Sequence, residues 1–172
     1  AGRSDEEKRR AMGKTLGDEG QDAAVITAPD SLAWLLTVRG GDVPRTPFAL
    51  GFAVLHKDGH VDVFMDPRKF TPATLAHLGN EVTVQPRDGF AAALDALGKE
   101  KKRVSIDTNT AGVWIRDRLA KAGAQVKVGE DPCALPKATK NTVEIEGTRA
   151  AHRRDGAAIT RFLAWLAVTA PK

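Results

Sequence analysis

The chain has 172 residues, 42% hydrophobic and 28% charged, a balance typical of one globular domain with or without an extra element. No stretch approaches the roughly 18–20 consecutive apolar residues of a membrane span, and a lone Cys133 excludes an internal disulfide and a multi-cysteine zinc site. Because the charged N-terminus AGRSDEEKRR also lacks the apolar core of a signal peptide, we expect a soluble protein of the reducing cytoplasm.

The net charge of +4 comes entirely from the end of the sequence. Residues 137–172 hold seven basic and three acidic residues, whereas the first 136 residues carry equal numbers of both signs. The densest basic run, 99–103, falls where a helix is expected to give way to a strand. The sequence also has no tyrosine on which a base could stack. We therefore expect no nucleic-acid partner.

Helix and strand patterns alternate along the first 128 residues. The segment from Asp5 to about Leu16 favours a helix, with Ser4 as N-cap and Glu7 as its capping-box partner. Strands are expected over 23–27, 49–56, 60–66, 81–85, 103–107 and 124–128, and helices over 29–38, 71–78, 90–97 and 111–123. The clearest signal is the turn 57–59, where an Asp-Gly pair separates two apolar runs and predicts a hairpin.

These six strands and their connections predict an α/β fold. One hairpin is antiparallel, while strands joined through helices favour parallel neighbours. The expected architecture is a six-stranded mixed sheet flanked by helices.

The sequence changes character after Gly129. Residues 130–141 contain two prolines and show no periodicity, which is typical of a linker. A helix pattern follows from residue 142 to about 169. Its apolar stripe comprises Ala151, Ala158, Phe162, Trp165 and Leu166. We expect a domain over 1–129, a linker over 130–141, and in 142–172 the first helix of a further domain. Because the chain begins at Ala1 without methionine, we also expect it to be part of a longer protein.

The residue types that carry chemistry form no recognisable set. His56 and His60 flank the hairpin turn, so two surface residues are favoured over a metal pair. Cys133 lies beside a proline in the expected linker, with no histidine near it in sequence to make it a nucleophile. Trp34 and Trp114 are expected in the core. The sequence therefore predicts no catalytic residue, no metal ligand and no cofactor.

Two long segments resemble the three-domain Xaa-Pro aminopeptidases (aminopeptidase P). DSLAWLLTVRGGDVPRTPFALGFAVLH (30–56) is similar to a stretch of their middle domain. DPCALPKATKNTVEIEGTRAAHRRDGAAITRFLAWL (131–166) looks like their junction with the pita-bread catalytic domain. The chain departs from the pattern at Thr37, where these proteins usually have asparagine. The resemblance implies the fold of the creatinase and prolidase N-terminal domains.

The resemblance also implies a metalloprotease parent. Such enzymes cleave the residue that precedes an N-terminal proline bond, using two divalent metals, usually manganese, whose ligands would lie beyond Lys172. This chain would then be a non-catalytic middle domain without a metal of its own, whose partners through the parent enzyme are proline-containing peptides. One alternative is a peptide- or protein-binding module from a pita-bread protein that has lost its metal ligands. Another is a free-standing interaction module.

The loop 39–47 is the best candidate for a functional surface. It places Arg39, Asp42 and Arg45 in a segment restricted by glycine and proline. The resemblance implies that these residues line the edge of the substrate cleft, whereas the simpler reading is an Arg39–Asp42 ion pair that braces the loop. The helix 142–169 is further expected either to fray or to pair with its copy in a homodimer.

Overall fold

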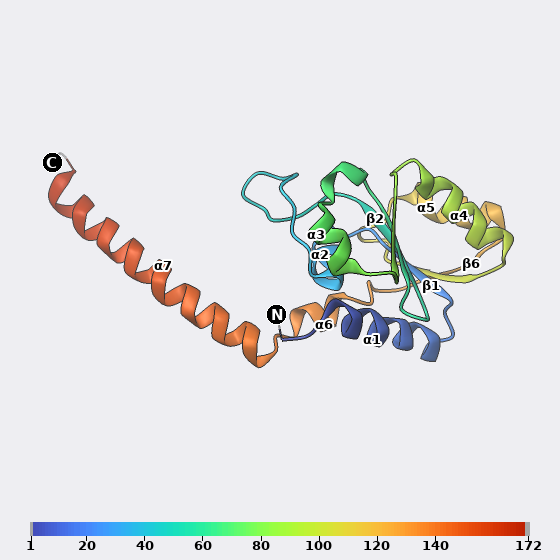
Figure 1. Cartoon of the computed structure of the whole chain (residues 1–172), viewed down its shortest axis with the longest axis horizontal. Helices are drawn as coiled ribbons and strands as arrows, with labels where there is room; N and C mark the ends of the chain where they lie inside the picture. The colour runs from blue at the N-terminus through green and yellow to red at the C-terminus, as the bar shows by residue number, and fades with distance from the viewer. Residues whose placement is uncertain (1, 171–172) are drawn as a thin grey trace. The chain divides into compact units, whose positions relative to one another are not determined.

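The structure is a computed structural model that describes residues 2–170 (Figure 1). The strands are β1 (Ala23–Ile26), β2 (Phe52–His56), β3 (Val61–Phe64), β4 (Val82–Gln85), β5 (Arg103–Ile106) and β6 (Gln125–Val128). The helices are α1 (Asp5–Asp18), α2 (Pro29–Leu36), the 3-10 helix η1 (Pro67–Lys69), α3 (Pro72–Leu78), α4 (Gly89–Lys99), α5 (Val113–Ala122), α6 (Ala134–Ala138) and α7 (Thr142–Thr169). Residues 3–138 form one compact unit, and α7 belongs to a second.

The six strands form one sheet in the order β4-β3-β2-β1-β5-β6. β1 pairs antiparallel with β2, and β2 pairs antiparallel with β3, whereas the β3–β4, β1–β5 and β5–β6 pairs are parallel. Five strands therefore run in one direction and β2 alone runs against them. The predicted α/β fold with a six-stranded mixed sheet is confirmed.

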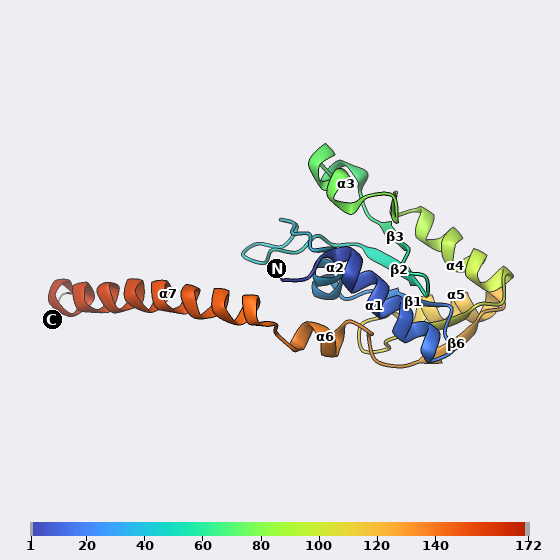
Figure 2. The ribbon, with the colours of Figure 1, turned by 60° about the horizontal axis from the view of Figure 1, so that its bottom comes forward.

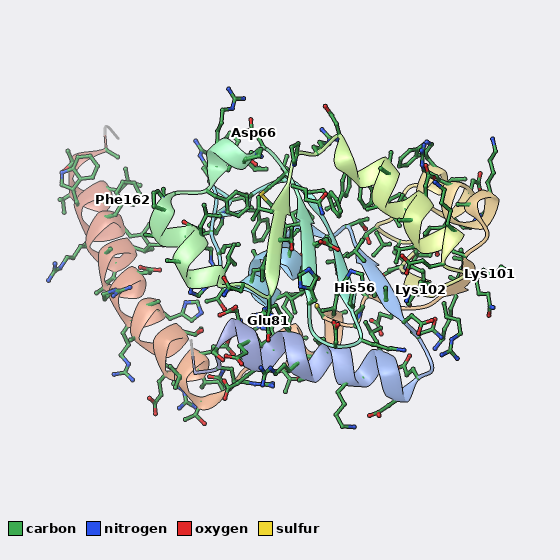
Figure 3. All side chains as sticks on the ribbon, turned by 45° about the vertical axis from the view of Figure 1, so that its right-hand side comes forward. His56, Asp66, Glu81, Lys101, Lys102 and Phe162 are labelled. Carbon is green, nitrogen blue, oxygen red and sulfur yellow. The ribbon has the colours of Figure 1, made fainter. Side chains whose placement is uncertain are left out.

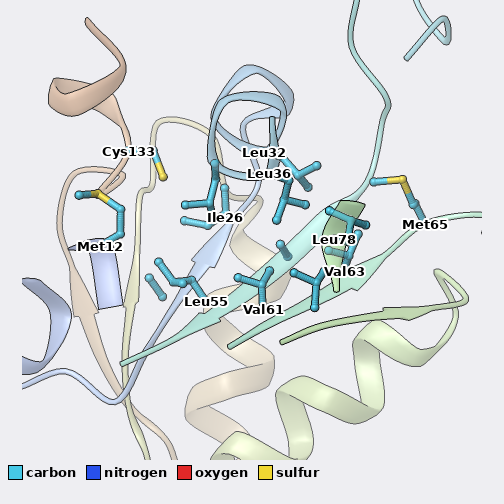
Figure 4. Packing of buried hydrophobic residues seen from close by; sticks show 14 of the residues in the cluster. Met12, Ile26, Leu32, Leu36, Leu55, Val61, Val63, Met65, Leu78 and Cys133 are labelled. Carbon is cyan, nitrogen blue, oxygen red and sulfur yellow. The ribbon is translucent and has the colours of Figure 1, made fainter. Parts of the chain in front are cut away.

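Helices cover both faces of the sheet, and each face has its own apolar cluster (Figure 2). Since side chains alternate along a strand, Val61 and Val63 of β3 join one cluster while Phe64 joins the other. The first cluster packs under α1, α2 and α3, as Met12, Leu32 and Leu78 show in Figure 4. The second cluster packs under α4 and α5.

The predicted β2–β3 hairpin forms at its Asp-Gly turn. Gly59 has φ +91°, a conformation that side chains with a Cβ rarely adopt, and its N–H donates to the carbonyl of His56 over 2.9 Å. Helix α1 crosses this turn closely at Gly13, where an added Cβ would lie 2.8 Å from the backbone nitrogen of Gly59. A glycine on each side thus allows the helix and the turn to meet.

The start of one strand and the burial of two tryptophans differ from what the sequence predicts. The strand expected over 49–56 begins only at Phe52, because the Leu50 N–H donates to the Asp42 carboxylate and the Leu50 carbonyl accepts from Lys69 instead of pairing with a neighbouring strand. Trp114 is 52% exposed and is not a core residue. Trp34 is half-buried and packs against the first cluster.

The expected linker 130–141 is ordered over much of its length. The Asp131 N–H donates to Asp107, the Cys133 N–H donates to Asp131, and the Cys133 side chain is fully buried in the first cluster. Helix α6 follows at once, and Lys137 reaches Asp30 at the start of α2. Residues up to 138 therefore belong to the compact α/β unit.

Helix α7 matches the predicted helix 142–169 and is described by itself. Asn141 caps it through a capping box, in which the Glu144 N–H donates to Oδ1 of Asn141 over 3.0 Å and the Asn141 N–H donates to the Glu144 carboxylate. None of its residues is buried, and its exposed large apolar side chains include Phe162 and Trp165, whose rings lie 6.0 Å apart. Among the described residues, no helix is both long and apolar enough to cross a membrane.

Candidate functional site

A hollow lies at the edge of the sheet where the parallel strands end. Because β1, β3 and β4 run in the same direction, the loops that follow them meet there, and open α/β sheets bind ligands at this edge. The hollow has a volume of about 770 Å³. Its lining comprises Thr27, Pro29, Asp42, Leu50, Gly51, Phe52, Met65, Asp66, Pro67, Arg68, Lys69, Pro86, Arg87 and Asp88.

The short helix η1 builds one wall of this hollow. Asp66 follows β3 and caps η1, since its Oδ1 accepts the Arg68 N–H over 2.9 Å (Figure 3). The Arg68 guanidinium returns to the same carboxylate, with Nη2 2.5 Å from Oδ2. These bonds lower the pKa of Asp66 to about 2 and raise the pKa of Arg68. The wall therefore presents a charged pair at neutral pH.

Asp42 fastens the long loop after α2 to η1. Its Oδ2 accepts the Leu50 N–H over 2.7 Å and lies 2.5 Å from Lys69 Nζ, which also donates to the Leu50 carbonyl over 3.2 Å. The Lys69 bond, followed by the Leu50 bond, lowers the pKa of the Asp42 carboxyl. One carboxylate thus joins two parts of the loop to a helix that lies 25 residues further along the chain.

The structure separates the three residues that the sequence grouped as site candidates. Asp42 lines the hollow. Arg39 instead donates from Nη1 to the carbonyls of Val38, over 2.9 Å, and Ala33, over 3.3 Å, at the end of α2. The expected Arg39–Asp42 ion pair is wrong, because Asp42 pairs with Lys69. Arg45 lies exposed in the loop with φ +62°.

Sequence reasoning missed the basic residues of the hollow. Arg68, Lys69 and Arg87 all line it, and each follows a strand that ends at this edge. Their position directly after β3 and β4 is the signal that could have identified them, since the carboxyl ends of parallel strands share one edge. The hollow therefore combines an apolar floor that includes Phe52 and Met65 with a charged rim.

The histidine pair at the hairpin lies away from this hollow. His56 Nε2 is 2.9 Å from one oxygen of Asp62, and His60 Nε2 is 3.5 Å from the other. The His56 hydrogen bond lowers the pKa of Asp62. Both histidine side chains are partly exposed. Across residues 2–170, no group of three or more His, Cys, Asp or Glu side chains is arranged to hold a metal ion.

The composition of the hollow can be compared with that of known kinds of site. The residues that line it include no histidine, serine or cysteine that could act as a nucleophile or base. Its apolar floor with a few charged groups at the rim is the composition of ligand-binding pockets in general.

Comparison with known proteins identifies the fold and its family. The family profile described as "Creatinase/Prolidase N-terminal domain" matches residues 1–144. The chain belongs to this family. The creatinase/prolidase N-terminal domain thus accounts for the whole α/β unit of residues 3–138.

Relatives of this creatinase/prolidase N-terminal domain are named as peptidases. A probable Xaa-Pro aminopeptidase P from Aspergillus flavus is 33% identical over 172 residues, which cover 96% of this chain and 26% of the relative. One from Penicillium rubens is 35% identical, over 96% of this chain and 28% of the relative. The chain therefore spans about a quarter of the length of these relatives.

A solved structure agrees with this similarity over the same share of the chain. It is the X-prolyl aminopeptidase from Caenorhabditis elegans, described as a cytosolic enzyme with a di-nuclear active site. The two chains are 28% identical with a TM-score of 0.88, over 96% of this chain and 27% of that enzyme. The resemblance to Xaa-Pro aminopeptidases found in the sequence is thereby confirmed.

Proposed function

We propose that the chain is the middle, non-catalytic domain of a metal-dependent Xaa-Pro aminopeptidase, joined to the first helix of its catalytic domain. The parent would hydrolyse the bond between an N-terminal residue and a following proline. The proposal rests on one observation: 96% of this chain is similar to a segment that makes up about a quarter of the length of proteins named as Xaa-Pro or X-prolyl aminopeptidases. The proposed location is the cytoplasm, as for the Caenorhabditis elegans enzyme.

The metal chemistry is assigned to the rest of the parent. Two divalent metals, for which we propose manganese, would activate a water there for attack on the peptide carbonyl. The residues described here do not fit such a site, because among 2–170 no three ligand-type side chains converge. This domain's own role is therefore to position the parts of the enzyme and to shape the edge of the substrate cleft.

The activity of the full-length protein tests the proposal. The substrates are a pentapeptide with proline at its second position and the same peptide with alanine there. We expect the full-length protein with manganese to cleave only the first peptide and to lose this activity with a chelator, while the 172-residue chain cleaves neither. Chelator-sensitive cleavage by the 172-residue chain would contradict a non-catalytic role. A full-length protein that binds the peptide without cleaving it would favour the binding-module alternative.

The proposed cleft edge consists of the loop 39–47 and the hollow beside it. Arg45 is exposed and pairs with no acidic side chain among the described residues, and an arginine suits the binding of a peptide carboxylate or carbonyl. In the full-length protein, Arg45→Ala should raise KM for pentapeptides about threefold to tenfold and leave dipeptides unchanged. The matched control is Arg116→Ala, because Arg116 is exposed on α5 outside the hollow. An equal effect of both variants would exclude the loop from the cleft.

We propose that the apolar side chains of α7 are covered by the catalytic domain in the parent. Exposed Phe162, Trp165 and Leu166 each forgo roughly 1.5–3 kcal/mol of burial. In the isolated chain a second copy of α7 would cover them, through the same stripe on both protomers. Light scattering tests this, since Trp165→Glu should convert a dimer into a monomer without lowering the Tm of the α/β unit. A monomeric wild-type chain at high concentration would rule out the dimer.

A further inference from the structure

A second hollow, lined by aromatic rings, adjoins the first one. It has a volume of about 590 Å³, within the range of pockets that hold small ligands and short peptides. The two hollows share Thr27, Phe52, Arg87 and Asp88. The remaining lining residues are Phe90, Ala91, Thr110, Gly112, Trp114 and Ile115. The second hollow thus lies between the starts of α4 and α5.

The rings in this hollow form a continuous series. Phe52 and Phe90 stack with their centroids 4.7 Å apart, and Trp114 follows at 6.4 Å from Phe90. Trp114 is nevertheless 52% exposed. Arg118 lies 5.3 Å from the Trp114 ring and is itself fixed by Asp95, with Nη2 2.6 Å from Oδ2. An exposed indole held at the end of a stack of rings is a preformed surface for an apolar ligand.

The side chain of Arg87 supplies a positive charge where the two hollows meet. The guanidinium of Arg87 lies 5.5 Å from the Phe52 ring. No carboxylate of the described residues forms an ion pair with it, whereas Arg68 and Arg118 both have one. Its planar group is therefore available to a carboxylate from outside the chain. Two hydroxyls, Thr27 and Thr110, lie 2.7 Å apart on the same lining and can bond to a peptide backbone.

We propose that this aromatic hollow binds the C-terminal part of a proline-rich oligopeptide, with proline rings against Phe52 and Trp114, the buried Phe90 ring supporting both, and the terminal carboxylate on Arg87. Aromatic grooves recognise proline-rich segments because the polyproline II conformation is preformed and loses little entropy on binding. The charge of Arg87 selects a free carboxylate. The kind of peptide rests on the proposed function, and the site rests on the geometry of the hollow.

Binding to the 172-residue chain can be followed without any catalytic step. The probes are the tetrapeptide Ala-Pro-Pro-Pro as the free acid, the same peptide as its amide, and tetra-alanine as the free acid. The readouts in ¹⁵N-labelled protein are the indole N–H signal of Trp114 and the backbone N–H signal of Gly112, which lines the same hollow. Comparison with Trp114→Phe assigns the indole signal among those of the three tryptophans.

We expect the free acid to shift the Trp114 signal, the amide to bind about tenfold more weakly, and tetra-alanine to have no effect. Arg87→Gln should weaken binding of the acid to the level of the amide, and Trp114→Ala, followed through the Gly112 signal, should abolish binding. Arg116→Gln is the matched control and should bind as the wild type does. Thermal melts of each variant identify any that fails to fold, and if Trp114→Ala does so, Arg87→Gln carries the test.

Three results would overturn the proposal. The first is an unshifted Trp114 signal at about 5 mM peptide, where even weak binding would be visible. The second is an equal response to tetra-alanine. The third is a Trp114 signal that shifts with protein concentration alone, which would make a second copy of the chain the occupant. Each of these results leaves the aminopeptidase assay of the full-length protein unaffected, so the two proposals fail separately.

Discussion

The close contact between α4 and α5 can be tested by adding one methyl group at Gly98. Gly98 lies in the last turn of α4 against the end of α5, and a Cβ added there would lie 2.3 Å from the Cβ of Ala122 and 2.7 Å from its carbonyl carbon. Real Cβ contacts essentially never fall below 3.0 Å, so the two helices would have to separate by about an ångström. This contact lies next to Leu97 and Leu119, which belong to the second apolar cluster.

Two effects of Gly98→Ala oppose each other. Alanine favours a helix by about 1 kcal/mol over glycine, whereas forcing a methyl group into a packed core costs about 1–3 kcal/mol. Because the clash involves backbone atoms that cannot rotate away, we expect the upper part of that cost. The net loss should be about 1–2 kcal/mol of unfolding free energy, with a fall in Tm of about 3–8 °C.

Gly17→Ala is the matched control, since Gly17 lies in α1 and the nearest atom to an added Cβ is 3.9 Å away. It should gain up to about 1 kcal/mol from helix propensity alone. Urea denaturation followed by circular dichroism measures both variants. If Gly98→Ala proves as stable as Gly17→Ala, then α4 and α5 do not approach closely enough for a methyl group at residue 98 to meet Ala122.

Three further predictions concern the same unit. Thr37 ends α2 in the left-handed conformation, with φ +55°, so Thr37→Asn should raise stability by about 0.5–1 kcal/mol in urea denaturation, and a loss would show that its bond from Lys8 matters more. The Lys57 bond and then the Arg103 N–H hold the pKa of Asp22 well below its ordinary value, so this carboxylate stabilises the fold above about pH 4 and its contribution is lost as the pH falls below that. Asp22→Asn should therefore lower the unfolding free energy at pH 7 and reduce its dependence on pH in the acid range, and an unchanged dependence would contradict the assignment. Burial raises the pKa of the Cys133 thiol, so a thiol reagent at pH 8 should label it only in denaturant, and fast labelling of the native chain would mean that α6 is not docked.

Local signals in the sequence predicted what depends on near neighbours. Ser4 and Glu7 form the expected capping box of α1, and the Asp-Gly turn forms the expected hairpin. Helix α6 has only five residues, too few for a periodic pattern, so no signal in the sequence distinguishes its segment from a linker.

Contacts between distant residues could not be read in the same way. The bond between Asp42 and Lys69 joins residues 27 apart, and the sequence around each residue contains no pattern that predicts the other as its partner. Trp114 was expected in the core because of its residue type. Ile115 and Leu119, however, occupy the buried face of α5. Trp114 therefore lies on the outer face of this helix, together with Arg118 one turn later. Residue type alone does not reveal which face of a short helix is buried.

The central position of β1 has a consequence for how the chain is made. Its four residues are all buried. One of its edges pairs with β2, the next strand in the sequence, and the other pairs with β5, about 80 residues further along the chain. During synthesis at about 5–20 residues per second, β5 is completed on the order of 1–4 s after β4. Throughout that interval one edge of an apolar strand has no partner, and such edges recruit strands from other chains. We therefore expect the newly made domain to be most prone to aggregation before residue 106 emerges, and slower translation between β4 and β5 to worsen it.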